Sequence, residues 1–225
     1  IKVMPSTKYC GNLKYKKNQN GEILFISSIK TDYFRHFGSQ PSDMERYIKS
    51  HKIFINSLND KLRKKLVFRG DINNNDIAKN WIENNPMGLI DDRTSRSFRT
   101  ALSNCTIVVC DYLSTAFSEA LVHNKPSVFF WNPNDFENQV NDNALKYFQL
   151  LKDVDILHDS PIDAADLLIE IYENIDEWWF NTKRQNAIKE FCFNTSRVSK
   201  TDLNDDFTSY NLSELTNSSL LISFI

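Results

Sequence analysis

Residues 106–131 read TIVVCDYLSTAFSEALVHNKPSVFFW. An apolar run at 106–110 opens this stretch and a second apolar run at 127–131 closes it. Between the two runs, a segment with helical spacing begins near Ser114 and is ended by the Asn-Lys-Pro sequence at 124–126. Because both runs are continuously apolar rather than alternating, we expect two fully buried strands joined by a helix, the repeating unit of a parallel sheet.

The same alternation extends to both sides of this stretch. Short apolar runs predict further strands at 23–27, 66–68, 88–90 and 154–157. Helical spacing predicts helices after a capping box at Ser42 and Glu45, around 77–82, 98–102 and 144–151, after Ser160-Pro161, and finally one helix holding Trp178, Trp179 and Phe191. The predicted fold class is therefore α/β: a doubly wound, mostly parallel, Rossmann-like sheet of about six strands with helices on both faces.

Three parts of the chain differ in pattern. Residues 1–21 are rich in Lys and Asn, and we interpret them as a linker or as the tail of a missing upstream domain. Residues 22–195 hold the strand–helix alternation and are expected to form one Rossmann-like domain. Residues 196–225 are rich in Ser, Asn and Asp, and are expected to form a flexible C-terminal tail.

Composition excludes several classes of protein. The 27 Lys and Arg residues against 29 Asp and Glu give a net charge of −2, which argues against a nucleic-acid-binding protein. No apolar run approaches the roughly 18 residues of a membrane span. The four cysteines form no C-x-x-C pair, so we expect buried free thiols in a reducing compartment. The four histidines are scattered, so no metal site is expected, and no P-loop, dinucleotide or nucleophile-elbow motif occurs.

The fold itself indicates where a ligand would bind. Doubly wound sheets bind ligands at the carboxyl ends of their strands, where the strand order reverses. With a Rossmann-like order, that point lies between the strands at 23–27 and 106–110. The loops after Ile26 and Cys110 would then form the site.

The helix that follows Cys110 begins with two hydroxyl side chains. Ser114 and Thr115 can cap this helix, and their hydroxyls together with the free backbone N–H groups would also suit a phosphate. Glu119 lies at i+4 from Thr115 on the same helix face, where a carboxylate could accept hydrogen bonds from a ribose diol. Ordinary helix capping explains the same residues, so both interpretations stay open at this point.

This region resembles a known family. The sequences DYLST at 111–115, EAL at 119–121 and NKPSVFFW at 124–131 are similar to the pattern D-x-x-S-T-T-x-x-E-x-L-x-x-N-x-P-T-x-x-F-W of transferases of bacterial surface-carbohydrate biosynthesis. That family is related to CDP-glycerol glycerophosphotransferases. The resemblance covers about 22–195, and Ala116 departs from it where the family often has a second Thr. It implies the C-terminal, nucleotide-sugar-binding half of a GT-B fold.

The resemblance also implies roles for single residues. Ser114 and Thr115 would contact the donor phosphate and Glu119 the ribose. Arg69, after the second strand, would meet phosphate or acceptor charge, although a surface ion pair explains it equally well. Arg35 is a further candidate for the phosphate, with a solvated loop position as its alternative.

Two other positions carry an open choice. Asp91 would lie near the nucleobase of the donor or would simply end a turn. Trp131 would line a cleft or belong to the core. The pair Trp178-Trp179 is expected to anchor the last helix by packing.

The function implied is that of a donor-nucleotide-binding domain of a glycosyl or glycerophosphate transferase in bacterial surface polysaccharide biosynthesis. Its partners would be a nucleotide-sugar or CDP-alcohol donor, a carbohydrate acceptor and a missing N-terminal domain, with no nucleic acid and no cofactor besides the donor substrate. No residue is assigned as catalytic base. The expected location is the cytoplasm, including the inner face of the cytoplasmic membrane, where the protein would be peripheral. The alternative is a non-catalytic Rossmann-like scaffold or remnant domain that binds a partner.

Overall fold

A single parallel sheet organises the protein. The computed structural model describes residues 21–27, 44–70, 90–91, 97–112, 114–136 and 140–196. In these residues six strands pair in the order β3-β2-β1-β4-β5-β6, and every pair is parallel. The strands are β1 (Ile23–Ser27), β2 (Leu66–Gly70), β3 (Ile90–Asp91), β4 (Ile107–Cys110), β5 (Ser127–Phe130) and β6 (Leu157–His158). The predicted doubly wound α/β fold is confirmed.

Both faces of the sheet are buried, as the continuously apolar strands require. Along β1, Ile23 and Phe25 belong to one core, whereas Leu24 and Ile26 belong to the other. The same alternation holds along β4 and β5. A strand with apolar side chains on both sides needs a cover of helices on each face.

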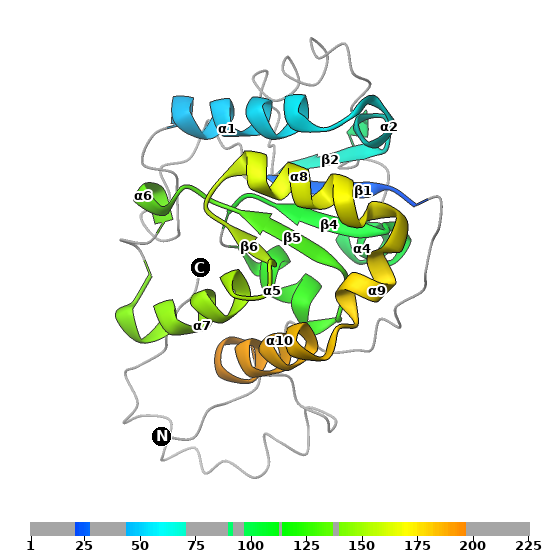
Figure 1. Cartoon of the computed structure of the whole chain (residues 1–225). Coiled ribbons are helices and arrows are strands. Elements are labelled where there is room, and N and C mark those ends of the chain that lie inside the picture. Colours follow the sequence, from blue (N-terminus) through cyan, green and yellow to red (C-terminus); the bar gives the residue numbers. More distant parts are fainter. Residues whose placement is uncertain are drawn as a thin grey trace.

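The helices form these two covers (Figure 1). On one face lie α1 (Met44–Ser57), α2 (Asp60–Arg63) and α8 (Pro161–Ile171). On the other lie α4 (Phe98–Asn104), α5 (Thr115–Val122), α7 (Asp142–Lys152) and α10 (Thr182–Thr195). The short helices α6 (Pro133–Phe136), η3 (Tyr172–Asn174) and α9 (Ile175–Trp179) complete the described elements. Ile175 lies in the core under α8 and Trp179 in the core under α10, so α9 leads the chain from one face to the other.

Several boundaries differ from the sequence prediction. The sixth strand begins at Leu157 instead of residue 154, because Asp155 has a positive φ of 58° and forms a turn. The final helix is two helices, because Asn181 ends α9 and caps α10 by accepting a hydrogen bond from the Lys183 N–H. The helix α6 was not predicted.

The inward face of α1 also differs. The helical spacing of apolar residues after Glu45 predicts Ile48, Ile55 and Leu58 on it. Ile55 and Leu58 are buried together with Tyr47, His51 and Phe54, whereas Ile48 is half-buried. The buried stripe of α1 therefore contains two polar side chains, Tyr47 and His51, which the spacing of apolar residues alone does not select.

Some predictions lie outside the described residues. These are the linker up to residue 20, Ser42, the loop with Arg35, the helix at 77–82 and the tail after residue 196. No helix among the described ranges is long and apolar enough to cross a membrane.

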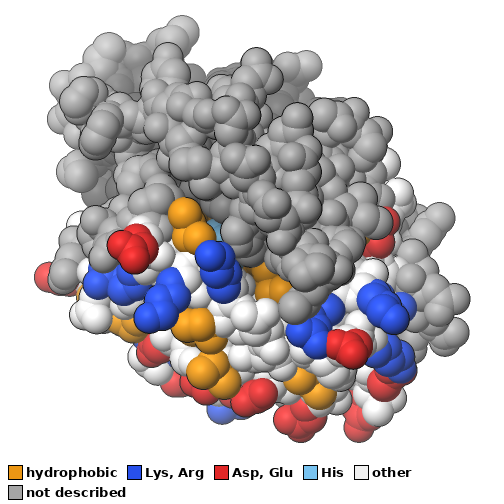
Figure 2. All heavy atoms as spheres, turned by 90° about the horizontal axis from the view of Figure 1, so that it is seen from above, with side chains coloured by type: hydrophobic (Ala, Val, Ile, Leu, Met, Phe, Trp, Pro, Cys, Tyr) orange, Lys and Arg blue, Asp and Glu red, His pale blue; other side chains and the backbone are white. Residues whose placement is uncertain are grey.

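Charge is distributed unevenly over the face with α1. Residues 44–70 hold eight Lys or Arg and two Asp or Glu, a net charge of +6, whereas residues 161–179 hold six Asp or Glu and no Lys or Arg, a net charge of −6. Since α1 packs against α8, the two segments lie side by side, and the hydrogen bond from Lys61 holds the pKa of Glu173 below its ordinary value. Figure 2, which looks onto this side, accordingly shows both signs on the described surface.

The cap of α8 gives a first testable prediction. The Ser160 Oγ accepts hydrogen bonds from the N–H groups of Ile162 (3.2 Å) and Asp163 (3.4 Å), and Pro161 occupies the first turn. Ser160→Ala should lower the free energy of unfolding by about 1 kcal/mol, measured by urea denaturation. Ser160→Asp keeps an acceptor and suits the helix dipole, so it should match the wild type. Equal stability of the alanine variant would show that this cap contributes nothing.

Candidate functional site at the switch point of the sheet

The strand order reverses between β1 and β4. From β1 the chain continues to β2 and β3 on one side, and from β4 it continues to β5 and β6 on the other. The register pairs Ile26 with both Arg69 and Cys110, so these three residues form one row across the carboxyl end of the sheet. This is the switch point at which the sequence placed the site.

The loop after β4 leads directly into α5. Ser114 has an extended backbone (φ −143°, ψ 170°), and its Oγ accepts the N–H of Phe117 at 3.3 Å. The predicted N-cap is therefore confirmed. The N–H groups of Thr115 and Ala116 precede the first intrahelical bond, which runs from the Ser118 N–H to the Ser114 carbonyl. Thr115 is exposed, and its N–H and hydroxyl are available to an anion.

The Cys110 thiol supports this loop from inside. Its Sγ donates to the Tyr112 carbonyl oxygen at 3.3 Å and also contacts the Ser114 side chain. Burial, together with the charge of Asp111, raises the pKa of Cys110 to about 12. The thiol therefore stays protonated at neutral pH, and it acts as a hydrogen-bond donor rather than as a nucleophile.

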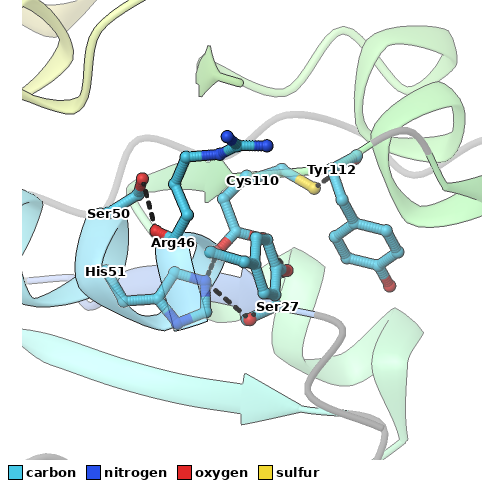
Figure 3. Close-up of polar contacts among 8 residues, drawn as sticks. Ser27, Arg46, Ser50, His51, Cys110 and Tyr112 are labelled. Atoms are coloured by element: carbon cyan, nitrogen blue, oxygen red, sulfur yellow. Dashed lines mark hydrogen bonds and ion pairs between the residues drawn. The ribbon is translucent and has the colours of Figure 1, made fainter. Parts of the chain in front are cut away.

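A buried polar cluster lies on the opposite face of the same strand ends (Figure 3). It consists of Ser27 from the end of β1, Asp111 directly after β4, and Tyr47 and His51 from α1; we call it the Ser27–Asp111 cluster. His51 is 0% exposed and Asp111 is 2% exposed. Tyr47 OH donates to Asp111 Oδ1 at 2.7 Å, and His51 Nε2 forms an ion pair with Asp111 Oδ2.

The directions of these hydrogen bonds follow from the carboxylate. Since a carboxylate only accepts, both Tyr47 and the Nε2 of His51 must present a proton to Asp111. The Tyr47 oxygen can then accept the proton of the Ser27 hydroxyl, whose Oγ lies 3.1 Å from Tyr47 OH and 3.2 Å from His51 Nε2. Each oxygen of the Asp111 carboxylate is thus approached by one donor, Tyr47 at Oδ1 and His51 at Oδ2, in a layer that is otherwise apolar.

The structure brings Arg69 to the same face of the sheet as α5. Arg69 follows Val67 at period two along β2, and Val67 belongs to the core under α4 and α5. Its guanidinium lies 5.7 Å from the centre of the Phe98 ring, a cation–π distance. Two strand spacings, roughly 10 Å, separate β2 from β4, so one ligand could contact both Arg69 and the start of α5.

The other predicted site residues lie differently. Glu119 lies in α5 one turn after Thr115 and is half-buried. Phe117 and Ala120 of the same helix face the core, and Glu119 lies outside this buried stripe. Asp91 pairs with Phe68 in the edge strand β3, three strand spacings or roughly 14 Å from β4, so it is not brought to Ser114. Arg35 lies outside the described residues.

Trp131 and Trp179 are core residues, and Trp178 is partly buried beside them. Trp131 is buried against Phe148, and its Nε1 donates to Asp159 Oδ1 at 2.9 Å. The core alternative for Trp131 therefore holds, and the cleft position was wrong. Trp179 is fully buried and anchors α9 to the turn after α5, as expected for a packing residue.

Sequence reasoning missed Tyr47, His51 and Ser27. Their separations along the chain from Asp111 are 64, 60 and 84 residues, so no local motif connects them. One signal was present, because Tyr47 and His51 are spaced i,i+4 in a helix. A histidine on the inward stripe of that helix needs a buried polar partner. Arg46 precedes Tyr47, and in Figure 3 its guanidinium extends from α1 on the side of the cluster where Cys110 and Tyr112 lie.

The described ranges contain no group of three or more His, Cys, Asp or Glu side chains that could hold a metal ion. A search of curated proteins finds no match.

A family profile does match the chain. The profile of the LIC12162 family transferases covers residues 1–208. The chain belongs to this transferase family. The match to the LIC12162 family includes the predicted linker and extends beyond the start of the predicted tail. The expectation of a transferase, drawn from the resemblance of residues 111–131, is therefore confirmed.

Solved structures add a partial similarity. A variant of the wall teichoic acid polymerase TagF soaked with CDPG is 14% identical, with a TM-score of 0.45 over 86% of this chain and 41% of that chain. A second TagF structure is 12% identical, with a TM-score of 0.43 over 86% of this chain and 43% of that chain. The LIC12162 family chain thus spans less than half the length of these TagF chains.

Proposed function

We propose that this chain is the donor-nucleotide-binding domain of a glycosyl or glycerophosphate transferase in bacterial surface polysaccharide biosynthesis. Membership of a transferase family supports a group-transfer reaction. The observation that carries the proposal is the position of the α5 N-terminus directly after β4, at the switch point of an open parallel sheet. This is where such sheets bind nucleotides and other anionic ligands.

The first turn of α5 would hold the phosphates of the donor. The N–H groups of Thr115 and Ala116 point out of the helix start, and the helix dipole favours negative charge there. The Thr115 hydroxyl adds a donor, while the Ser114 hydroxyl accepts the Phe117 N–H and also bonds the Cys110 thiol, so that it would meet the phosphate at the edge of this network. Glu119, one turn later, would accept hydrogen bonds from the ribose.

Arginine would supply the positive charge of the site. Arg69 reaches the same face of the sheet as α5 from β2. As the bond between the transferred group and the donor phosphate breaks, negative charge builds on the leaving nucleotide. Donors placed beforehand at that position stabilise the transition state.

In this proposal the nucleotide-activated donor is a substrate, so the reaction needs no resident cofactor. We assign the carbohydrate acceptor and the catalytic base to a second domain, because Asp111 and His51 at this edge are buried against each other and Glu119 would hold the ribose. Because the donor is nucleotide-activated, we expect the reaction on the cytoplasmic side, with the protein peripheral to the membrane.

The test is a calorimetric titration with CMP, CDP, UDP and GDP. Saturable binding of one nucleotide is expected, and Ser114→Ala/Thr115→Ala should weaken it at least about tenfold, because hydrogen bonds to a charged phosphate are lost. Ser160→Ala is the matched control: it removes an N-cap hydroxyl of similar stability cost at α8, away from the site, and should leave binding unchanged.

Equal affinity of the wild type and the double variant would contradict the assignment of the phosphate site. Failure of the folded wild type to bind any of the four nucleotides would contradict donor binding by this chain.

A further inference from the structure

Four polar side chains are buried at the carboxyl ends of the two central strands. In the Ser27–Asp111 cluster, Tyr47 and His51 reach from one turn of α1 to the carboxylate of Asp111. The cluster is packed against aromatic rings, since the His51 ring lies 5.5 Å from that of Phe25 and 4.4 Å from that of Tyr47. Water is therefore excluded from the ion pair.

Stability alone is a poor explanation for such a cluster. A buried ion pair costs desolvation energy, and apolar residues of similar volume commonly serve the core as well or better. What hydrogen bonds of fixed geometry add is orientation. Here two donors converge on one carboxylate, which fixes the position of Asp111 relative to α1.

Asp111 is the residue through which this orientation reaches the proposed ligand site. It is the first residue after β4 and stands three positions before Ser114, the cap of α5. The chain on the other face is held by the Cys110 thiol, which donates to the Tyr112 carbonyl. Asp111 and Tyr112, the first two residues after β4, are thus held from both faces of the sheet.

We propose that Tyr47 and His51 are positioning residues: by holding Asp111 they set the place of the β4–α5 loop and of the helix start that it carries. Both side chains are buried, so their effect on a ligand would act through Asp111. The effect on ligand affinity rests on the function proposed above. The effect on the position of Asp111 rests on the hydrogen bonds alone.

Tyr47→Phe is the most conservative probe, because it removes one hydroxyl and leaves the ring. The chain offers a matched control. The Tyr172 hydroxyl donates to the Gly21 carbonyl oxygen at 2.7 Å, the same length as the bond from Tyr47 to Asp111, and the two tyrosines are similarly buried at 7% and 4% exposed. Gly21 precedes β1, so Tyr172 acts at the opposite edge of the sheet.

The first measurement is amide hydrogen exchange without ligand. The N–H groups of Phe117 and Ser118 both bond to Ser114 and report on the start of α5. Tyr47→Phe should speed their exchange about fivefold or more, whereas Tyr172→Phe should leave them unchanged. The amides of Val108 and Val109 in β4 serve as the reference for any global loss of stability. Equal effects of the two variants on α5 would overturn the proposal.

The second measurement is nucleotide affinity together with the unfolding temperature. In Tyr47→Phe the dissociation constant for the nucleotide that binds the wild type should rise about tenfold, and in Tyr172→Phe it should not change. His51→Gln keeps an N–H donor near the Nε2 position and should retain affinity, whereas His51→Leu should lose it. A purely structural role would lower the unfolding temperature of the variants and leave the affinity of the folded protein unchanged, which would also overturn the proposal.

The two proposals fail in different ways. If no nucleotide binds the wild type but Tyr47→Phe alone loosens the start of α5, the positioning role stands and the proposed function fails. If nucleotide binds and the exchange contrast is absent, the proposed function stands and the positioning role is wrong.

Discussion

Trp179→Ala is expected to lower the free energy of unfolding by about 3–5 kcal/mol, the range for removing a large buried aromatic side chain. Trp179 is 0% exposed, and its Nε1 donates to the carbonyl oxygen of Asn124 at 3.0 Å and to its Oδ1 at 2.9 Å. Asn124 has a positive φ of 50°, and Gln185 also bonds its amide. The substitution would therefore open a cavity and remove the indole hydrogen bonds to Asn124 in the turn between α5 and β5.

At 2–4 °C for each kcal/mol in a domain of this size, the unfolding temperature should fall by about 10 °C, measured by circular dichroism. Two variants control the measurement. Trp179→Phe keeps most of the volume and loses only the indole donor, so its cost should be about 1–2 kcal/mol. Phe180→Ala, next in the chain but 46% exposed, should cost less than about 1 kcal/mol. A Trp179→Ala variant as stable as Phe180→Ala would contradict the packing described for α9 and α10.

His51→Leu is expected to cost about 3–5 kcal/mol as well, for a different reason. Leucine fills the space of the imidazole, so little cavity forms. The cost arises because the carboxylate of Asp111 would stay buried with one of its two donors gone. Urea denaturation followed by tryptophan fluorescence measures it.

A double-mutant cycle isolates this pair. His51→Leu/Asp111→Asn removes the charge that His51→Leu leaves buried, so the double variant should be more stable than the sum of the two single effects predicts. Additive effects, or a His51→Leu variant within about 0.5 kcal/mol of the wild type, would contradict an ion pair between these side chains.

The sheet could be predicted because its central strands are recognisable from their own residues. The strands β1, β4 and β5 are continuous apolar runs bounded by turn residues, and a parallel sheet buries both faces of such strands. The N-caps at Ser114 and Ser160 were predictable for a similar reason. Each is a local pattern in which a hydroxyl bonds an N–H group two or three residues later.

The boundaries that failed depend on distant contacts. The apolar pair Val154 and Ile156 suggested a strand start, but the buried Arg184, thirty residues later, donates from its Nε to the Val154 carbonyl oxygen at 2.8 Å. That bond holds the segment around Val154 in a turn, so β6 begins only at Leu157. Arg184 also bonds the Trp178 carbonyl, across the break between α9 and α10 that the sequence did not indicate.

The candidate site divides in the same way. Ser114, Thr115 and Glu119 lie in one short segment, so their common helix could be predicted from spacing. Tyr47 and His51 meet Asp111 only because β1 and β4 become neighbours in the folded sheet. The sequence offered one sign, a histidine on the buried stripe of α1. It indicates that a buried polar partner exists, but not which residue that partner is.

The central claim is that a nucleotide binds at the start of α5. It is tested most directly by following the backbone amide resonances of the ¹⁵N-labelled chain while CDP, or whichever of the four nucleotides binds, is added. The account predicts saturable shifts that are largest at Thr115 and Ala116 and extend to Arg69 and Ile26. Saturable shifts centred instead on the opposite edge of the sheet, near Thr106 and Lys125, or no saturable shift at all, would contradict it.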